Sequence, residues 1–377
     1  MTEKIIEGIK YLLEEETLTA EVIKNPNGYR GNIIIPETIV FNEVTYRVTS
    51  VGKQAFGNCF SLTSVVIPNS VTSIGRDAFW GCDSLKSIVI SNGVTSIGEA
   101  AFMCCDSLKS IVIPNSVISI EDNAFKACVS LKSIVIPESV TSIGETVFWG
   151  CDSLTSIIVA EGNTVYDSRE QCNAIIETAT NKLISVCKKT IIPDGVTSIG
   201  SVFSQCDSLT SITIPDSVTS IEKEAFLSCV ALKSIVIGNG VTSIGETAFD
   251  DCSSLTSIVV AEGNTVYDSR EQCNAIIHTA TNTLISGCQN TIIPDSVKSI
   301  GEAAFYYCSS LTSIVIPDSV TSIGEAAFMG CDSLKSITFN GTKMQWNSIE
   351  LGDEWNCEIP AQIVRCTDGN VKIEECW

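Results

Sequence analysis

The chain has 377 residues and a formal net charge of −21, with 44 acidic and 23 basic side chains. Nucleic acids and anionic membranes are bound through basic side chains, so this charge argues against both kinds of partner. No run of 18 apolar residues occurs, and the sequence therefore predicts no transmembrane helix.

Residues 1–46 are predicted to form an N-terminal β cap. We expect short strands at Tyr11–Leu13, Thr17–Val22, Asn32–Ile35 and Val44–Val48, with a turn at Asn25-Pro26-Asn27-Gly28. Such a cap would cover an open strand edge, which otherwise invites aggregation. The first residues have neither a basic leader nor an apolar signal region, so a cytoplasmic location and export after removal of a signal both stay open.

From residue 47 to residue 340 the chain repeats a unit of 23 residues, and one phenylalanine marks each copy. The spacing is 23 within each run of the series Phe56, Phe79, Phe102, Phe125, Phe148, Phe203, Phe226, Phe249, Phe305 and Phe328. A fixed period of this length predicts a solenoid, in which each unit buries its apolar side only against its neighbours.

Each unit predicts the same local elements. The pattern Leu-x-Ser-Ile-x-Ile, as in Leu108–Ile113, predicts a strand that stacks in parallel on its copies, and Val94–Ile97 predicts a second, shorter extended piece. Between strands, Glu99–Phe102 predicts a short helical or 3₁₀ corner. The predicted fold class is a repeat solenoid with parallel β-strands, short corners and a cap at each end.

Ten of the 18 cysteines recur three residues after the phenylalanine. They are Cys59, Cys82, Cys105, Cys128, Cys151, Cys206, Cys229, Cys252, Cys308 and Cys331. In stacked coils such side chains point the same way, which is poor geometry for a disulfide and predicts a ladder of buried thiols. For Cys172 with Cys187, and Cys273 with Cys288, pairing stays an alternative.

Two irregular inserts, at 160–192 and 261–293, interrupt the repeat with nearly the same sequence. Each contains Asn-Ala-Ile-Ile, a Thr-Ala-Thr-Asn turn and Leu-Ile-Ser, which predicts a hairpin within the stack. Residues 341–377 are predicted to form a C-terminal cap containing Trp346, Trp355 and Trp377. The spacing of Cys357, Cys366 and Cys376 does not fit a zinc knuckle.

The unit Ile-Pro-x-Ser-Val-Thr-Ser-Ile-Gly-x-x-Ala-Phe-x-x-Cys-x-Ser-Leu-x-Ser-Ile-x closely resembles the BspA-type class of leucine-rich repeats, over residues 48–339. The resemblance implies a leucine-rich-repeat-like stack on a bacterial surface or secreted protein, with attachment to matrix proteins, cells or surfaces and no catalysis. Where leucine-rich repeats generally place Asn or Cys, this chain has serine, as at Ser116, so the usual buried asparagine ladder is missing.

The sequence offers no catalytic constellation. The single histidine, His278, corresponds to Glu177 in the other insert, and a residue that its twin replaces is a poor candidate for catalysis. Nucleophile elbows, phosphate-binding loops and His/Cys metal clusters are missing from the sequence. We therefore expect no enzyme activity, no cofactor and no metal.

The candidate binding residues are those expected to point outward from the stacked strands. They are Lys86, Ser87, Val89, Lys109, Ser110, Val112, Lys132, Ser133 and Val135. An exposed valine stripe is unusual unless a partner covers it, although the β-propensity of valine alone would also explain the stripe.

The sequence thus predicts a non-catalytic scaffold for protein or glycan recognition and adhesion on a host or neighbouring cell surface. From the family resemblance we expect the protein to be secreted or at the cell surface. The alternative is a structural or spacer protein of the cell envelope with no specific soluble ligand. The oligomeric state cannot be predicted.

Overall fold

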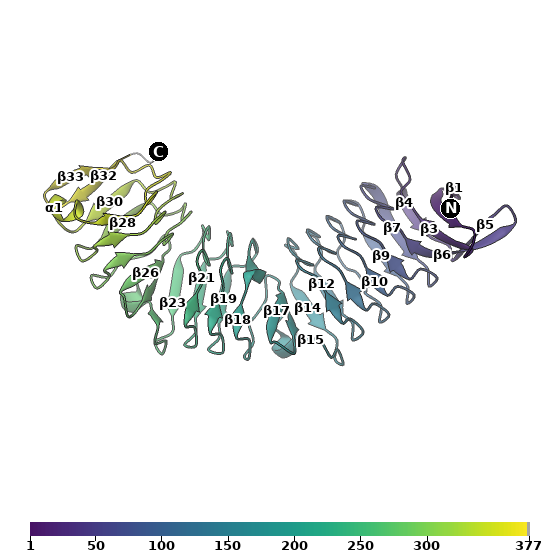
Figure 1. The fold of residues 1–377 in the computed structure, drawn as a ribbon, viewed down its shortest axis with the longest axis horizontal. Coiled ribbons are helices and arrows are strands. Elements are labelled where there is room, and N and C mark those ends of the chain that lie inside the picture. Colours follow the sequence, from purple (N-terminus) through teal and green to yellow (C-terminus); the bar gives the residue numbers. More distant parts are fainter. Residues whose placement is uncertain (375–377) are drawn as a thin grey trace. The chain divides into compact units, whose positions relative to one another are not determined.

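The computed structural model describes residues 1–374 and contains two compact units, Met1–Thr190 and Ile191–Trp377. Over the described residues the chain is a parallel β-solenoid of about 14 turns with few helices, which confirms the predicted fold class. Within each unit the strands of successive coils lie side by side (Figure 1).

The first unit opens with six strands. They are β1 (Thr2–Ile6), β2 (Ile9–Glu14), β3 (Thr19–Val22), β4 (Arg30–Ile34), β5 (Thr38–Phe41) and β6 (Val44–Val51). Strands β1, β2 and β3 form an antiparallel meander, whereas β3 pairs in parallel with β6 and β4 pairs in parallel with β7 (Ser61–Ile67). The expected strands of this region are therefore present, and they already pair with the first regular coils.

Most regular coils contribute one longer strand to a wall that we call the strand face. Besides β7, these strands are β9 (Ser87–Ile90), β12 (Ser133–Ile136), β14 (Ser156–Val159), β19 (Ser211–Ile214), β21 (Ser234–Ile237), β23 (Ser257–Val260), β28 (Ser313–Ile316) and β30 (Ser336–Phe339). They pair in parallel with equivalent residues opposite each other, for example Ser64 with Ser87. The register follows the repeat because a slip of one residue would turn the buried isoleucines outward.

The strand predicted at Leu108–Ile113 is absent. Only an isolated parallel bridge joins Ser110 to Ser133, and residues 111–113 pair with neither neighbour. The side chains keep the alternation of the other coils, since Ile111 and Ile113 are buried and Val112 is exposed. The prediction was therefore wrong for the backbone pairing and right for the direction of the side chains, and nothing in the structure explains the break.

A second wall is built from two-residue strands in the Val-Thr-Ser-Ile segment. They are β8 (Ser73–Ile74), β10 (Ser96–Ile97), β11 (Ser119–Ile120), β13 (Ser142–Ile143), β18 (Ser198–Ile199), β20 (Ser220–Ile221), β22 (Ser243–Ile244), β27 (Ser299–Ile300) and β29 (Ser322–Ile323). These short strands also pair in parallel and in register, as Ser96 does with Ser119.

The corners between the walls are hydrogen-bonded turns, with a 3₁₀ helix only at η2 (Ser201–Phe203) among the regular coils. In a typical coil the residues two before and two after the phenylalanine have positive φ, as at Ala100 (52°) and Cys104 (56°) around Phe102. A left-handed residue on each side of the phenylalanine prevents helical continuation. The corners stack as well, since the Phe79 amide donates to the Ala101 carbonyl at 2.7 Å.

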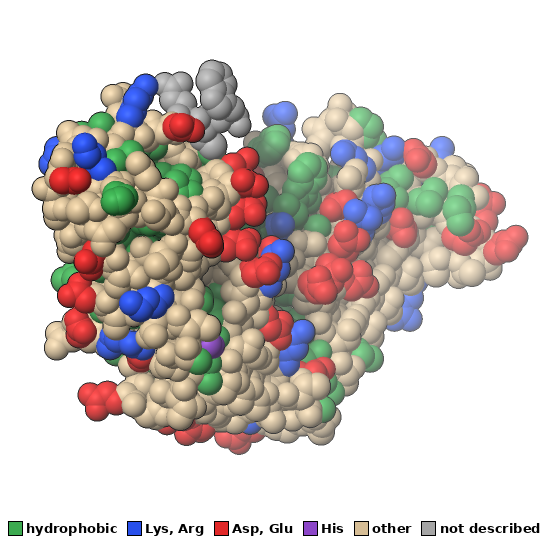
Figure 2. Space-filling model, turned by 60° about the vertical axis from the view of Figure 1, so that its left-hand side comes forward, with side chains coloured by type: hydrophobic (Ala, Val, Ile, Leu, Met, Phe, Trp, Pro, Cys, Tyr) green, Lys and Arg blue, Asp and Glu red, His purple; other side chains and the backbone are tan. Residues whose placement is uncertain are grey.

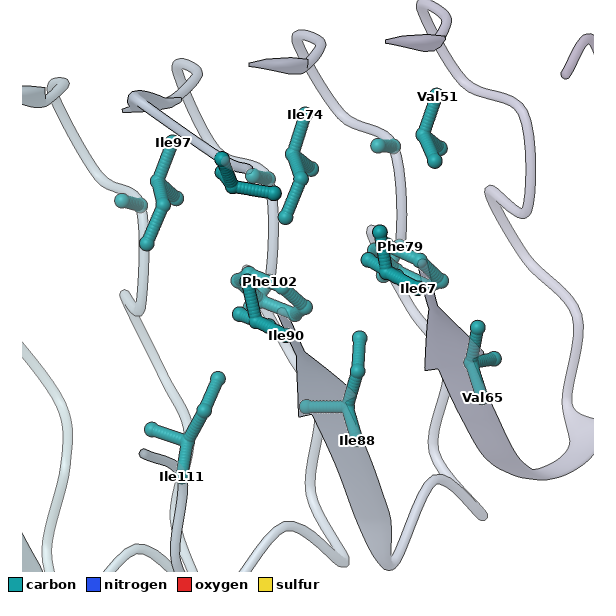
Figure 3. Close-up of a cluster of buried hydrophobic side chains, with 14 of the residues drawn as sticks. Val51, Val65, Ile67, Ile74, Phe79, Ile88, Ile90, Ile97, Phe102 and Ile111 are labelled. Carbon is teal, nitrogen blue, oxygen red and sulfur yellow. The ribbon is translucent and has the colours of Figure 1, made fainter. Parts of the chain in front are cut away.

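The phenylalanines form an internal column in each run of regular coils. The Phe79 and Phe102 rings are stacked with centroids 5.1 Å apart, and Phe102 and Phe125 follow at 5.3 Å. Figure 3 shows Phe79 and Phe102 between two rows of aliphatic side chains, one of which contains Ile74 and Ile97. Each coil thus supplies the apolar wall that its neighbour needs, as the period predicts.

Nine of the ten repeated cysteines are buried and form the predicted ladder, whereas Cys206 is only partly buried, and several thiols of the ladder also donate hydrogen bonds. The Sγ of Cys82 donates to the Phe56 carbonyl at 3.1 Å, and that of Cys105 donates to the Phe79 carbonyl at 3.3 Å. Serine replaces the missing asparagine ladder in a similar way, since the Ser116 hydroxyl donates to the Val94 carbonyl at 2.6 Å. Coils are therefore joined by side-chain bonds to backbone as well as by apolar packing.

The two inserts fold alike. The first contains β15 (Tyr166–Asp167), η1 (Arg169–Gln171), β16 (Ile175–Glu177) and β17 (Lys182–Ser185), and the second contains β24 (Tyr267–Asp268), η3 (Arg270–Gln272), β25 (Ile276–His278) and β26 (Thr283–Ser286). Strand β16 pairs antiparallel with β17, and β25 with β26, which confirms the predicted hairpins. Cys172, Cys187, Cys273 and Cys288 are free, so the alternative of disulfides between them does not hold.

The described C-terminal part contains α1 (Lys343–Trp346), β31 (Glu350–Leu351), β32 (Ile363–Cys366) and β33 (Gly369–Lys372). Helix α1 begins at a capping box, in which Thr342 and Gln345 satisfy each other's backbone amides. Trp346 and Trp355 are buried, and Trp355 meets Phe328 edge-on at 6.2 Å. Trp377 and Cys376 lie outside the described residues.

Candidate binding face

The strand face of the first unit presents the candidate binding residues to solvent. In β9 and β12 exposed and buried positions alternate strictly, so Ser87 and Val89 point outward while Ile88 and Ile90 enter the core. All nine predicted residues are exposed, including those of the unpaired coil at 108–113. The structure therefore brings them onto one surface, while their role in binding stays a prediction.

These residues form three parallel rows, because equivalent positions of successive coils lie opposite each other. The apolar row contains Val66, Val89, Val112, Val135 and Ile158. The structure extends this row by one residue that the sequence reading missed, since Ile34 of β4 lies opposite Val66 and is 72% exposed. A signal was present, because residues 32–36 end in Ile-x-Ile-Pro like a regular strand.

The apolar row is well exposed. Val89 is 55% exposed, Val112 is 78% exposed and Val135 is 51% exposed. Figure 2 shows, on the face in view, exposed apolar side chains interspersed with basic and acidic ones. An exposed apolar row of this length is a candidate interaction site, because removing apolar surface from water is favourable.

The basic row consists of Lys86, Lys109 and Lys132, which precede the outward serines of three successive coils. Within residues 1–374 none of these three ammonium groups has a carboxylate within ion-pair distance. The basic side chains that do form ion pairs are Lys10, Arg76, Arg169, Lys223 and Arg270. In a chain with a net charge of −21, unpaired neighbouring lysines leave a positive strip available to a partner.

The serine row also has free hydrogen-bonding capacity. Over the described part of the chain, the hydroxyls of Ser87, Ser110 and Ser133 form no hydrogen bond within the protein. On the wall of two-residue strands the outward threonines behave differently, since Thr95 donates to the Thr72 carbonyl at 3.1 Å. The hydroxyls of Ser87, Ser110 and Ser133 are therefore available to a partner, whereas Ser64 of the same row donates to Asn32 at 2.8 Å.

The second unit has a similar strand face with fewer lysines. Its outward apolar residues include Val236, Val259, Ile292 and Val315, which are between 37% and 71% exposed. At the basic position, threonine alternates with lysine through Thr210, Lys233 and Thr256. The apolar row is therefore common to both units, whereas three consecutive lysines occur only in the first.

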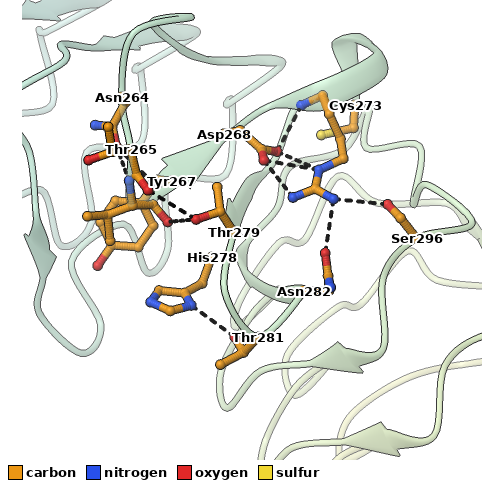
Figure 4. Close-up of polar contacts among 12 residues, drawn as sticks. Asn264, Thr265, Tyr267, Asp268, Cys273, His278, Thr279, Thr281, Asn282 and Ser296 are labelled. Atoms are coloured by element: carbon orange, nitrogen blue, oxygen red, sulfur yellow. Dashed lines mark hydrogen bonds and ion pairs between the residues drawn. The ribbon is translucent and has the colours of Figure 1, made fainter.

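His278 has a structural role in the second insert. Its Nδ1 lies 3.0 Å from the Thr281 hydroxyl, as Figure 4 shows, and its ring meets Tyr267 edge-on. In the first insert Glu177 accepts a hydrogen bond from Thr180, at the equivalent position of the turn, at 2.5 Å. Histidine and glutamate thus make the same contact, which gives His278 a role without catalysis.

The buried thiols are poor nucleophiles and metal ligands. Burial raises the pKa of Cys82 and of Cys308 to about 12, so these thiols are protonated at neutral pH. Among residues 1–374 no group of three His, Cys, Asp or Glu side chains is placed to hold a metal ion.

One buried carboxyl group stands apart. Asp250 is 7% exposed, its Oδ2 has no hydrogen-bond partner among the described residues, and it lines a small cavity with Ser286, Gly287 and Tyr306. Burial, and then repulsion from Asp251, raise the pKa of Asp250 to about 7. The equivalent position beside the first insert is Trp149, so a carboxyl group does not recur at this position of the repeat.

In the described residues no helix is long and apolar enough to cross a membrane. The profile of the BspA type Leucine rich repeat region matches residues 49–173, 182–290 and 284–350, in six copies. No curated protein sequence matches the chain.

Several solved structures resemble the chain. A leucine-rich repeat protein from Bacteroides ovatus is 29% identical over 94% of this chain and 92% of its own, with a TM-score of 0.57. A leucine-rich repeat protein from Eubacterium ventriosum is 21% identical over 98% and 99%, with a TM-score of 0.54. A leucine rich cell surface protein from Faecalibacterium prausnitzii is 26% identical over 93% and 98%, with a TM-score of 0.48.

Proposed function

Because the chain belongs to the BspA-type leucine-rich repeat family, we propose that it is a non-catalytic scaffold that binds a protein or a glycan at a bacterial cell surface. The observation that carries this proposal is the strand face of the first unit, where exposed apolar, hydroxyl and ammonium groups lie in rows. A solenoid offers such a broad, regular wall for recognition. The surface location rests on the resemblance of the repeat to surface and secreted proteins.

The chemistry of the face favours binding over catalysis. Val89, Val112 and Val135 would lose contact with water under a partner, and each Å² of apolar surface covered contributes about 25 cal/mol. The face has no activated nucleophile. The carboxyl group whose pKa is raised most, Asp250, lies in a different unit from the lysine row, and Asp106, whose pKa is also raised by burial, lies at a turn and not on the strand face.

The second candidate is a structural or spacer protein of the cell envelope. The exposed valines would then reflect only the preference of stacked strands for β-branched residues. This candidate predicts that changing the strand face leaves attachment to purified matrix proteins and glycans unchanged.

The test compares two variants that carry three new carboxylates each on exposed positions of the same unit. One is Val89→Asp/Val112→Asp/Val135→Asp on the strand face, and the control is Thr95→Asp/Ile118→Asp/Thr141→Asp on the other wall. Binding of each purified protein to a panel of matrix proteins and to a glycan array is measured by surface plasmon resonance, with folding checked by circular dichroism.

We expect the native chain to bind at least one member of the panel, and the strand-face variant to lose that binding at least tenfold while the control keeps it. Equal binding by both variants, or no binding by the native chain, would favour the spacer role. Turnover of a glycan or peptide by the purified chain would overturn the non-catalytic assignment.

We further infer that residues 1–46 and 341–377 act as caps of the solenoid at 47–340. In support, β1 to β3 form a meander beside β6, and Trp346 and Trp355 are buried against the last coils. Deletion of residues 1–46 should cause concentration-dependent association in analytical ultracentrifugation, because it exposes a strand edge. A monomeric, folded truncated chain would contradict the capping role.

A further inference from the structure

The strand face of the first unit has lysine in three consecutive coils, at Lys86, Lys109 and Lys132. We propose that these coils, with their outward serines and valines, bind a linear polymer of uronic acids whose chain runs across the strands. The proposal rests on the proposed function of the strand face and specifies the class of its ligand. We call the nine residues Lys86, Ser87, Val89, Lys109, Ser110, Val112, Lys132, Ser133 and Val135 the lysine array.

The charge of the lysine array is open to a ligand. The three lysines are exposed, and within residues 1–374 no carboxylate pairs with them, although the chain as a whole is strongly acidic. The aspartates of the same coils, Asp83 and Asp106, lie near each other and near Cys104 at the turn. Burial, and then the charge of Asp83, raise the pKa of Asp106. A carboxylated ligand would therefore supply counter-charges that the protein does not.

The spacing of the array favours a sugar polymer over a polypeptide. Successive coils are close together here, since the Phe79 and Phe102 rings are 5.1 Å apart and the Phe102 and Phe125 rings are 5.3 Å apart, so the lysines advance by nearly this step from coil to coil. An extended peptide places side chains on one face only every second residue, about 6.6 Å apart, and falls out of step. One ring of a 1→4-linked pyranose chain advances by close to one coil, so carboxylates on the same side of a polyuronate, which recur at about every second ring, stay in step with every second lysine.

The other two rows complement such a ligand. The hydroxyls of Ser87, Ser110 and Ser133 make no hydrogen bonds within the described protein and can pair with sugar hydroxyls. Val89, Val112 and Val135 offer an apolar strip to the C–H faces of the rings. Cationic, hydroxyl and apolar rows side by side match the three kinds of surface of a polyuronate chain.

The test uses polygalacturonate as the probe and biolayer interferometry as the readout, at low and at physiological ionic strength. We expect the native chain to bind polygalacturonate and not its neutral methyl ester. Its affinity for polygalacturonate should fall as the ionic strength rises. Lys86→Gln/Lys109→Gln/Lys132→Gln should weaken binding about tenfold, since three exposed charge pairs are lost. The matching Lys→Arg triple should retain binding, because it keeps the charges.

The control variant is Lys233→Gln/Lys298→Gln/Lys335→Gln, which removes the same charge from exposed positions of the second unit. It should change the affinity less than twofold. Equal losses in the two triples would mean diffuse attraction and would overturn the proposal. Equally tight binding of poly-L-glutamate would assign the array to acidic polypeptides instead, and no binding of polygalacturonate at low salt would also overturn it.

Failure here is distinguishable from failure of the proposed function. If polygalacturonate does not bind but the Val→Asp variant loses a ligand of the panel, the strand face binds a different class of molecule. If neither experiment shows binding, both proposals fall together.

Discussion

Regular coils and inserts stack on their neighbours through different kinds of contact. In the regular coils the partner of a residue is its own copy one coil away, as Phe79 is for Phe102 and Ser96 is for Ser119. In the inserts many partners are local. Arg270 donates to Asp268 at 2.6 Å and to Asn282 at 3.0 Å, all within one insert (Figure 4).

The difference shows how a repeat protein can tolerate an interruption. A copied contact needs only that the same residue returns after 23 positions, whereas an insert must bring its own polar network and its own links to the coils before it. In the second insert Asn264 provides two of these links. Its Nδ2 donates to the carbonyls of Gly238 and Val241 at 2.9 Å, and its Oδ1 accepts from the amides of Val266 and Tyr267.

The largest effect is expected in the phenylalanine column. Phe102 is fully buried and stacked on both sides, so Phe102→Ala should lower the free energy of unfolding by about 4 kcal/mol, as deletion of a buried ring typically does. The control Phe60→Ala removes a ring that is 58% exposed and should stay within about 0.5 kcal/mol of the native chain. Urea unfolding followed by circular dichroism measures both, and similar losses would contradict the role of the column.

The next effect tests the links that Asn264 provides. Asn264→Ala should cost about 3 kcal/mol, because it leaves buried amides and carbonyls without partners. Asn163 makes the same four bonds in the first insert but is only partly buried, so Asn163→Ala should cost less, since water can replace the side chain. Hydrogen exchange at the amides following each asparagine locates the loss. An equal cost in the two copies would show that burial does not set the size of the effect.

These residues also show where sequence reasoning succeeds and where it stops. The column around Phe102 and the thiols around Cys105 were predictable, because in a stack of equal coils each residue meets its copy. The roles of Asn264 and Ser116 were not, because their partners are backbone carbonyls of the preceding coil, which have no sequence signature. The missing strand at 110–113 has no counterpart in the sequence, which repeats there without change.

For the candidate site, the outward orientation of the side chains was predictable, and their ion pairing and ligand were not. Alternation in the strand placed Ser110 and Val112 outward correctly, since a period of two fixes which side chains face solvent. The lack of ion pairs at Lys109 could not be predicted, because Asp106 is only three residues away in the sequence and only the structure shows that no described carboxylate lies within ion-pair distance. The ligand itself could not be predicted, because its chemistry belongs to another molecule.

The buried carboxyl group of Asp250, in the coil that precedes the second insert, predicts that the free energy of unfolding depends on pH. The folded state raises the pKa of Asp250 from 3.8 to about 7, so it binds the proton more tightly than the unfolded chain. Stability is then highest at low pH and falls as pH rises from about 4 to about 7, by roughly 2 kcal/mol between pH 5 and pH 8.

Asp250→Asn should remove this fall in stability between pH 5 and pH 8, and the variant should be more stable than the native chain at pH 8. The control Asp318→Asn changes an exposed carboxylate and should keep this fall. Urea unfolding at pH 5 and pH 8 measures it, and a native chain that gains stability toward pH 8 through Asp250 would reverse the assignment.

The smallest effect separates two adjacent cysteines in one regular coil. Cys105 is fully buried and donates to the Phe79 carbonyl, so Cys105→Ala should cost about 1 kcal/mol through one lost hydrogen bond and a small cavity. Cys104 lies outside the ladder and is partly exposed, and Cys104→Ala should change the free energy of unfolding by less than about 0.5 kcal/mol. Both variants remove one thiol from neighbouring positions, and they differ in the hydrogen bond to the Phe79 carbonyl and in burial. Equal urea midpoints would mean that neither the hydrogen bond nor the packing of the Cys105 thiol stabilises the stack, and the regular coils would then depend on their other apolar copies and on backbone pairing.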